Sequence, residues 1–372
     1  MKLSSVLVAM QEHTASDAYI SVDAPVMLRV DGRLKPLSSP LSLAAINVML
    51  NSAMNEEQKQ QFITKREANF AVKRSVGRFR ISAYWQRDMP SMVIRRIETE
   101  IPRLSSLGTP VVLEELAMQK RGLVLVVGAT GSGKSTTMAA MMGFRNHYGQ
   151  GHILTVEDPI EFVHEHQQCI VSQREIGIDT QDYETALKNA LRQAPDMVVI
   201  GEIRTPETMN FALQFAETGH LCLATLHANN AYQALERALH LMPKAQRETF
   251  LFDLSMNLKG VIAQQLVPGV NGVGRHGAFE LLINNAHVAE LIRNGELHAL
   301  KKAMLSGEHF GMQTFDQSLY ALYVQGSISE DEALRHADSA NELKLMIKTG
   351  AKHSAPGSAL DHVRIERAGS LD

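Results

Sequence analysis

The stretch Gly128-Ala-Thr-Gly-Ser-Gly133-Lys134-Ser135 decides the fold of this chain. It follows an apolar run at 123–127 and precedes a helical pattern that starts near Lys134, the strand–loop–helix order of a phosphate-binding loop. Glycines let backbone N–H groups turn toward phosphates, the lysine reaches the terminal phosphates, and the serine hydroxyl coordinates Mg²⁺. The sequence therefore predicts a nucleotide site made of Gly128, Ala129, Thr130, Gly131, Ser132, Gly133, Lys134, Ser135 and Thr136.

Short apolar strands and helical patterns alternate on either side of this loop. Strands are expected at 123–127, 153–156, 197–200 and 221–226, with helices starting near Lys134, Tyr183 and Pro206. Thr205 before Pro206 is a good N-cap signal, and Gly219 is a stop signal for that helix. Such alternation predicts an α/β domain with a parallel sheet covered by helices.

Acidic residues follow two of these strands. Glu202 comes after 197–200, and Glu157, Asp158 and Glu161 come after 153–156. Ligands of open α/β sheets bind at the carboxyl ends of strands, so we expect these acids to face the nucleotide. Glu202 would hold the water shell of Mg²⁺, and one of the other three could position or deprotonate the attacking water. The alternative for those three is a solvated acidic loop.

Two histidines, His220 and His227, flank the expected strand 221–226. At about 3.3 Å per residue their rings lie roughly 20 Å apart, so they cannot share a metal ion. Each could sense a phosphate or bridge to a neighbour, or simply cap the strand. A second histidine pair, His164 and His166, has no third ligand at a recognisable spacing, which favours a solvated loop over a metal site.

Composition restricts the remaining possibilities. The 372 residues predict two or three folding units, and 37 basic against 40 acidic residues give a net charge of −3, which argues mildly against binding nucleic acid or anionic lipid. Cys169 and Cys222 have no ligand spacing, so we expect no disulfide and a cytoplasmic location. No apolar run approaches the roughly 18 residues of a membrane span.

The first hundred residues predict a separate α+β domain. Alternating residues 15–37 include the hairpin signal Asp31-Gly32, amphipathic stretches follow at 41–52 and 55–66, and residues 70–86 alternate again. We place an N-terminal domain at 1–102, a linker at 103–110 and the α/β core at 111–285. A helical subdomain is expected at 286–349, with a capping box at Ser329-Glu-Asp-Glu332, and a mobile tail at 350–372.

Arginines are frequent in the N-terminal domain. Among them are Arg78, Arg80, Arg95 and Arg96, which lie upstream of the phosphate loop. Such residues can form a charged face or pair locally, and in a ring they can reach the γ-phosphate bound by the adjoining subunit.

Four segments in order resemble the Walker A, Asp box, Walker B and His box of the type II/type IV secretion ATPase superfamily. They are GATGSGKST from Gly128, ILTVEDPIEF from Ile153, DMVVIGEIR from Asp196 and TGHLCLATLHANNA from Thr218. The segments ASDAYISVDAPVMLRVDGRL and RFRISAYWQ resemble the PAS-like N-terminal domain of the same superfamily. The resemblance therefore implies a PAS-like α+β domain followed by a RecA-like P-loop ATPase core with a helical C-terminal subdomain.

Within the superfamily the chain resembles the pilus retraction ATPases, the PilT and PilU proteins. The long additional N-terminal domain and the four-cysteine zinc element of the extension and secretion branches are missing from the sequence. The segments Ile94-Arg-Arg-Ile-Glu-Thr-Glu-Ile-Pro102 and Ala289-Glu-Leu-Ile-Arg-Asn294 look more like the PilU branch than the PilT branch.

The resemblance also implies roles for individual residues. Lys134 and Ser135 would serve phosphate and Mg²⁺, Glu202 would take the Walker B role, and Glu161 would be the catalytic base. Glu157 and Asp158 would support the base and are further candidates for the metal site. His220 and His227 match the His box, while Arg80 and Arg95 match arginines that complete a neighbour's site.

The function implied is ATP hydrolysis, with Mg²⁺, by a homohexamer that powers pilus retraction and twitching motility. Its partners would be a PilT-like ATPase and an inner-membrane platform protein, with no nucleic acid, and its location would be cytoplasmic and peripheral to the inner membrane. An accessory module with little motor activity of its own remains an alternative. A nucleic-acid translocase is a third, disfavoured by the net charge of −3.

Overall fold

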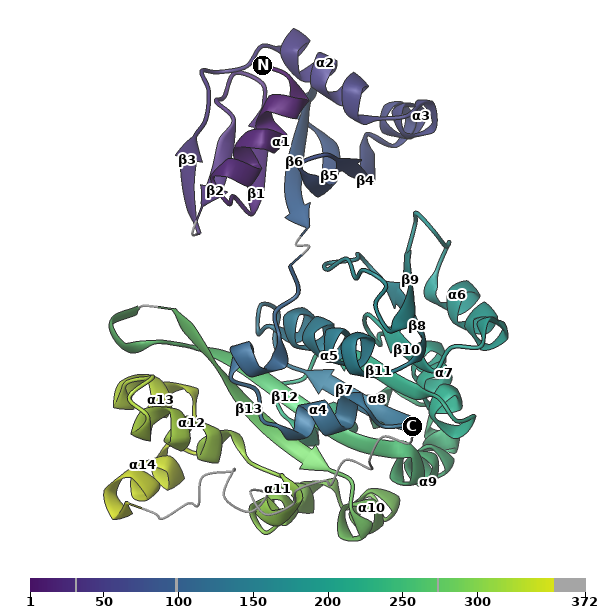
Figure 1. Ribbon diagram of the computed structural model, residues 1–372, viewed down its shortest axis with the longest axis vertical. Coiled ribbons are helices and arrows are strands. Elements are labelled where there is room, and N and C mark those ends of the chain that lie inside the picture. Colours follow the sequence, from purple (N-terminus) through teal and green to yellow (C-terminus); the bar gives the residue numbers. More distant parts are fainter. Residues whose placement is uncertain (31, 98–99, 273, 351–372) are drawn as a thin grey trace, which may run out of the picture. The chain divides into compact units, whose positions relative to one another are not determined.

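The chain is described by a computed structural model that covers residues 1–350 except 31, 98–99 and 273 (Figure 1). Its internal contacts divide it into two compact units, Met1–Glu100 with Ile160–His164, and Ile101–Pro159 with Glu165–Asp372. Residues 160–164, which we expected in the core, thus group with the first unit. The tail that we expect to be mobile lies outside the described residues from 351 onward.

The first unit is an α+β fold around an antiparallel sheet of order β3-β2-β1-β6-β5-β4. Its strands and helices are α1 (Leu3–Glu12), β1 (Asp17–Ser21), β2 (Met27–Val30), β3 (Arg33–Pro36), α2 (Leu43–Ala53), α3 (Glu56–Lys65), β4 (Glu67–Arg74), β5 (Gly77–Gln86) and β6 (Met89–Ile97). Val30 pairs with Arg33 in the β2–β3 hairpin that the Asp31-Gly32 signal predicted; Asp31 itself lies outside the described residues.

Alternation explains both the core of this unit and how the stretch at 70–86 is arranged. Phe70, Phe79, Ile81 and Ile94 point to one face and are buried, and the polar residues between them are on the other face. The alternating stretch 70–86 contains parts of two strands, β4 and β5, because the chain turns at residues 75–76 between Arg74 and Gly77. Periodicity of two continues across such a short turn, so it does not reveal the break.

The second unit contains a seven-stranded sheet of order β13-β12-β7-β11-β10-β8-β9. Its strands are β7 (Gly122–Val127), β8 (Gly151–Glu157), β9 (Cys169–Glu175), β10 (Met197–Ile200), β11 (Leu221–Leu226), β12 (Leu258–Pro268) and β13 (Arg275–Ile283). All neighbouring pairs are parallel except β12–β13. Every residue of β7, β10 and β11 is buried, as expected of central strands covered on both faces.

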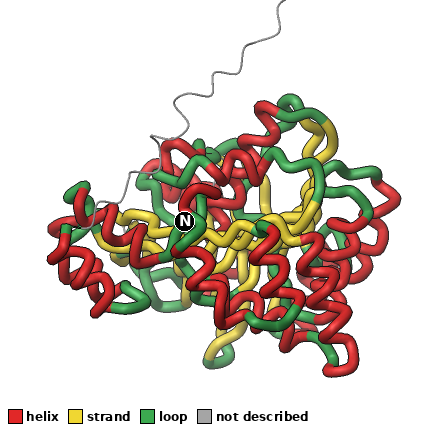
Figure 2. The backbone as a smooth tube through the Cα atoms, turned by 90° about the horizontal axis from the view of Figure 1, so that it is seen from below, coloured by secondary structure: helices red, strands yellow, loops and turns green. Residues whose placement is uncertain are grey.

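Helices cover both faces of this sheet (Figure 2). Val124 and Val126 pack with α4 (Val112–Ala117) and α5 (Lys134–Tyr148). Leu123, Leu125 and Val127 point the other way, toward a second group of helices. That group is α6 (Tyr183–Ala190), α7 (Pro206–Glu217), α8 (Ala231–Leu241) and α9 (Arg247–Asn257). The prediction of an α/β fold with a parallel sheet between helices is therefore confirmed.

The last part of this unit that the structure describes is helical. Its helices are α10 (Ala286–Arg293), α11 (Leu300–Leu305), α12 (Phe315–Val324), α13 (Glu330–His336) and α14 (Ala340–Thr349). Ser329 caps α13 by accepting from the N–H of Glu332 at 3.2 Å, so half of the predicted capping box is confirmed. The Glu332 carboxylate accepts a hydrogen bond from Arg335 at 2.7 Å, and so it turns away from the N-cap.

The segment 103–110, expected as a linker, packs onto the second unit. It forms a 3₁₀ helix, η1 (Leu104–Leu107), and Leu104 is buried in the cluster that contains Val124 and Val126. Its serines and glycine broke the apolar period in the sequence, but one leucine is enough to anchor four residues of helix. Among the described residues no helix is both long and apolar enough to cross a membrane.

Candidate nucleotide site

Four adjacent strands of the larger sheet end at the same edge, and several of the predicted site residues lie there. In the order of the sheet they are β7, β11, β10 and β8. Val127 is in register with Leu226, and Ile200 is in register with both Ala224 and Val156. Gly128, His227 and Gly201, which follow three of these strands, and Glu157, the last residue of β8, therefore lie along one edge. Such carboxyl edges are where open α/β sheets bind ligands.

Two glycines shape the phosphate loop, and a side chain at either would clash with Gln264. Gly128 has φ +154°, and a Cβ there would collide with the Gln264 carbonyl oxygen and Ser132 Oγ. Gly133 has φ +90°, and its Cβ would be 2.7 Å from Gln264 Nε2. Gln264, on the neighbouring strand β12, is buried and accepts a 2.7 Å hydrogen bond from Thr137 Oγ1. The loop is thus packed against a residue that the sequence pattern did not single out.

Polar groups inside the loop fit a bound phosphate. Lys134 is buried, and its Nζ donates to the carbonyl oxygens of Gly128 at 2.8 Å and Ala129 at 2.9 Å. Ser132 Oγ is buried and makes no hydrogen bond to any described residue. Helix α5 starts at Lys134, and its N-cap, Gly133, offers no side-chain cap. The N-terminal N–H groups of this 15-residue helix are left for an anion.

Glu202 is held by two basic partners at the end of β10. Arg204 Nε donates to Glu202 Oε2 at 2.8 Å, and His227 Nε2 lies 3.2 Å from Glu202 Oε1. The Thr225 hydroxyl donates to the carbonyl oxygen of Gly201, which ties the start of this segment to β11. The predicted Walker B acid and the second His-box histidine are therefore in direct contact.

The acids at the end of β8, Glu157 and Asp158, lie next to a tyrosine. Glu157 Oε1 accepts hydrogen bonds from Thr155 Oγ1 at 2.6 Å and Gln173 Nε2 at 3.1 Å. Tyr183 opens α6, and burial, followed by the negative charge of Asp158, raises the pKa of its hydroxyl above the usual value. The sequence pattern predicted Tyr183 only as the start of a helix. Its aromatic hydroxyl at the first helical position was the one available signal that it belongs to the site.

Comparison with known proteins decides the family. The model of the family described as type II/IV secretion system protein matches residues 2–275. This chain belongs to that family. It is 53% identical to the type IV pilus ATPase PilU of Pseudomonas aeruginosa over 357 residues, 95% of this chain and 94% of the relative. It is 38% identical to the pilus retraction ATPase PilT of the same organism over 339 residues, 91% of this chain and 98% of the relative.

A solved structure of this family has the same fold. The crystal structure of the pilus retraction motor PilT with bound ADP aligns with a TM-score of 0.87 at 38% identity, covering 93% of this chain and 100% of that one. The predicted membership of the secretion ATPase superfamily, the greater similarity to PilU than to PilT, and the fold class are confirmed. The prediction of an ATPase is thereby confirmed as well.

Mg²⁺ is expected in a secretion ATPase, and the residues at the loop fit it. Among the described residues no three His, Cys, Asp or Glu side chains gather to hold a metal. Ser135 at the start of α5 and Glu202 after β10 nevertheless offer a hydroxyl and a carboxylate at the same edge of the sheet. Mg²⁺ characteristically takes one or two protein oxygens and completes its shell with phosphates and water. These two residues would hold it; Glu157 and Asp158 stay further candidates.

His220 does not join this group. It precedes β11, at the end of the strand opposite His227, roughly 20 Å away at about 3.3 Å per residue. Its Nδ1 lies 3.2 Å from the Phe215 carbonyl oxygen and 3.0 Å from Thr218 Oγ1, so it fastens the end of α7. Its catalytic role stays a prediction from the family motif.

The second histidine pair differs from the solvated loop that we expected. His164 is buried, and burial lowers its pKa to about 4, so the ring is neutral. His166 is exposed, and its Nδ1 accepts a 3.0 Å hydrogen bond from the Val171 N–H. Cys169 and Cys222 are both buried and free.

Three predicted site residues belong to the first unit. Glu161 is exposed in segment 160–164. Arg80 on β5 and Arg95 on β6 are direct partners in the sheet, so their side chains share a face. Arg95 Nε donates to Asp17 Oδ1 at 2.9 Å. The roles of these three residues toward nucleotide stay predictions.

Proposed function

We propose that this chain hydrolyses ATP as a homohexameric motor of type IV pilus retraction, working with a PilT-like ATPase on an inner-membrane platform protein. The observation that carries the proposal is the edge at which the phosphate loop, His227, Glu202 and Glu157 lie at the carboxyl ends of four adjacent parallel strands. The 53% identity to a type IV pilus ATPase over almost the full length of both proteins supports the pilus as the setting.

The phosphates of ATP would lie in the loop. Backbone N–H groups from Ala129 to Gly133 and at the start of α5 would donate to the phosphate oxygens. Lys134 would exchange its hydrogen bonds to the two carbonyl oxygens for contacts with the terminal phosphates. Bound Mg²⁺ would neutralise charge on the β- and γ-phosphates, held by Ser135 and, through water, by Glu202. Thr136 adds a second hydroxyl beside Ser135.

Hydrolysis needs a base and cations at the terminal phosphate. Glu161 would take the proton of the attacking water as its oxygen bonds to phosphorus and the bond to ADP breaks. Arg80 and Arg95 would stabilise the developing charge in the site of the adjoining subunit. This arrangement requires a ring, because the arginines of one subunit would serve the nucleotide of the next.

Steady-state phosphate release by the purified full-length chain tests the enzyme part of the proposal. Lys134→Ala should lower turnover at least a hundredfold, since charge stabilisation and phosphate positioning dominate such reactions. Lys344→Ala removes an exposed lysine on α14 and is the matched control, expected at wild-type turnover. Wild-type turnover in Lys134→Ala would contradict the proposal.

Partner experiments separate the motor from an accessory module. Light scattering reports whether the chain forms a hexamer, and phosphate release is compared with and without a PilT-like ATPase. A motor hydrolyses ATP alone; negligible hydrolysis alone and a gain with the partner would favour the accessory alternative. Retraction measured with this chain as the only ATPase completes the comparison.

A further inference from the structure

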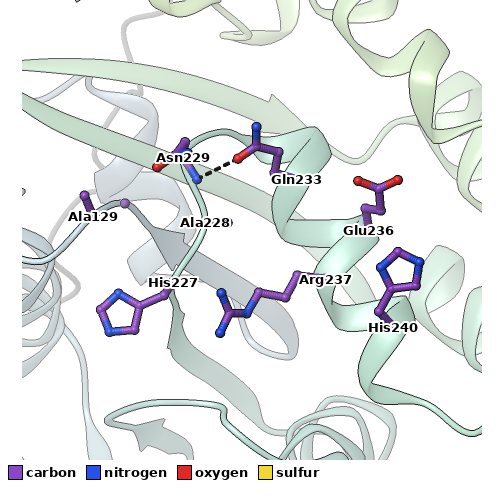
Figure 3. A pocket seen from close by; sticks show the side chains of 9 residues that line it. Ala129, His227, Ala228, Asn229, Gln233, Glu236, Arg237 and His240 are labelled. Atoms are coloured by element: carbon purple, nitrogen blue, oxygen red, sulfur yellow. Dashed lines mark hydrogen bonds between the residues drawn. The ribbon is translucent and has the colours of Figure 1, made fainter.

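A cavity of about 430 Å³ opens beside the first two residues of the phosphate loop (Figure 3). Gly128 and Ala129 form one side, the segment from His227 to Asn229 forms another, and the exposed face of α8 forms the third. All of these residues belong to the second unit. The volume exceeds that of a single phosphate several times, so the cavity can admit the end of a polyphosphate chain with its water.

Helix α8 presents its polar face to this cavity because its apolar face is buried. Ala231, Ala234, Leu235 and Ala238 pack inward at helical spacing. Gln233, Glu236, Arg237 and His240 are left on the cavity side. The start of the helix is fixed: Asn230 Oδ1 accepts from the Gln233 N–H at 2.9 Å, and buried Glu280 accepts from the Ala231 N–H at 2.7 Å.

The acidic and amide groups of this wall already have partners. Tyr232 donates to Glu236 Oε1 at 3.0 Å, and the Asn229 N–H donates to Gln233 Oε1 at 3.3 Å (Figure 3). His227 lies against Glu202. Arg237, in contrast, makes no hydrogen bond or ion pair with any residue in the described part of the chain. A guanidinium is always charged and forms a fork of donors that matches phosphate oxygens.

These observations assign a role to Arg237 that rests on the nucleotide site proposed above. We infer that Arg237 binds the terminal phosphate of a nucleoside triphosphate and that the cavity distinguishes triphosphate from diphosphate. With the α- and β-phosphates in the loop and at the start of α5, a third phosphate would continue toward the side of the loop where Gly128 and His227 line the cavity. ADP has no group that reaches Arg237.

The test is the affinity of the full-length chain for two nucleotides, measured by displacement of a fluorescent ADP with ADP or with the β,γ-imido analogue of ATP, both with Mg²⁺. Arg237→Gln should weaken the imido analogue tenfold or more and change ADP affinity less than threefold. Arg237→Lys keeps the charge without the fork of donors, so its affinity for the imido analogue should lie between those of wild type and Arg237→Gln. Arg192→Gln, an exposed arginine after α6, is the matched control and should leave both affinities unchanged.

Other outcomes overturn the inference. Equal affinities in Arg237→Gln and wild type, or equal losses for both nucleotides, would show that Arg237 does not read the third phosphate. An unchanged affinity ratio together with a smaller assembly in light scattering would assign Arg237 to a contact with another subunit instead. If the wild-type chain binds neither nucleotide, the proposed function fails, and that result is distinct because it does not involve Arg237.

Discussion

Asp17 and Arg95 face each other across β1 and β6, where Arg95 Nε donates a 2.9 Å hydrogen bond to Asp17 Oδ1. The register extends this pair into a row of charged side chains on one face of the sheet, with Arg29 on the far side of Asp17 and Arg80 beside Arg95. Arg29 Nε is 3.7 Å from Asp17 Oδ2. The buried carboxylate therefore orients Arg95 and offsets the repulsion between Arg95 and Arg80.

If Arg95 serves a neighbour's nucleotide, Asp17 is its positioning residue. Arg95→Ala should lower kcat for ATP hydrolysis at least tenfold, and Asp17→Asn should lower it by a smaller factor with little change in KM. The double variant should match Arg95→Ala, because the two side chains act through one interaction. Arg29→Ala breaks the other side of the same carboxylate and is the control. If Arg29→Ala lowers kcat as much as Arg95→Ala does, the row of charged side chains has a structural role and Arg95 has none toward nucleotide.

The contact between Glu202 and His227 leads to a second prediction. Glu202→Gln should abolish most turnover while nucleotide still binds, and His227→Gln should lower kcat about tenfold because it frees one oxygen of Glu202. His220→Gln, at the opposite end of the strand, should change kcat less than His227→Gln. Equal losses at the two histidines would restore the role that the His-box motif implies for His220.

Glu161 is the predicted base, and its own loop supplies the control. Glu161→Gln should lower kcat by a hundredfold or more and leave ADP affinity unchanged, since general-base catalysis contributes about 10²–10⁴-fold. Glu165→Gln changes another exposed acid four residues along the chain and should keep wild-type turnover. If Glu161→Gln also keeps wild-type turnover, Glu161 is not the base and the acids of this segment are a solvated cluster.

Local signals predicted the frame of the site well. The structure agrees with the predicted positions of the phosphate loop, the starts of α5, α6 and α7, and the strands β10 and β11. These elements depend on short-range signals, namely runs of apolar residues for buried strands and caps such as Thr205 for helices. The predicted Thr205 cap is confirmed by its hydrogen bond from the Thr208 N–H.

Contacts between distant segments could not be predicted in this way. Gln264 supports the loop from β12, 127 residues beyond Thr137, and Asp17 reaches Arg95 across 78 residues. No sequence pattern singled out Arg237, which lines the same cavity as Gly128 only because the fold places α8 beside the loop. Such pairs depend on strand order and register, which no short-range pattern contains.

Buried Glu280 gives the last prediction, which concerns stability against pH. It lies on β13, where burial above all raises its pKa to about 7; the Ala231 N–H opposes that shift, as does Lys301, and Asp338 adds to it. An unfolded glutamate titrates near 4.5, so between pH 4.5 and 7 the folded chain binds the additional proton. Stability from this group is therefore greatest at low pH and falls as pH rises to 7, by on the order of 3 kcal/mol.

Glu280→Gln removes the titration and should remove this slope. Urea unfolding at pH 5, 6, 7 and 8 gives the free energy of unfolding of both proteins. The value for the variant relative to wild type should increase as pH rises, whatever the difference at pH 5, because only wild type must ionise a buried carboxyl. Glu290→Gln, an exposed acid on α10, is the control and should run parallel to wild type. Parallel curves for Glu280→Gln and wild type would mean that Glu280 ionises in the folded chain as readily as in water, and that the N–H groups around it stabilise its charge fully.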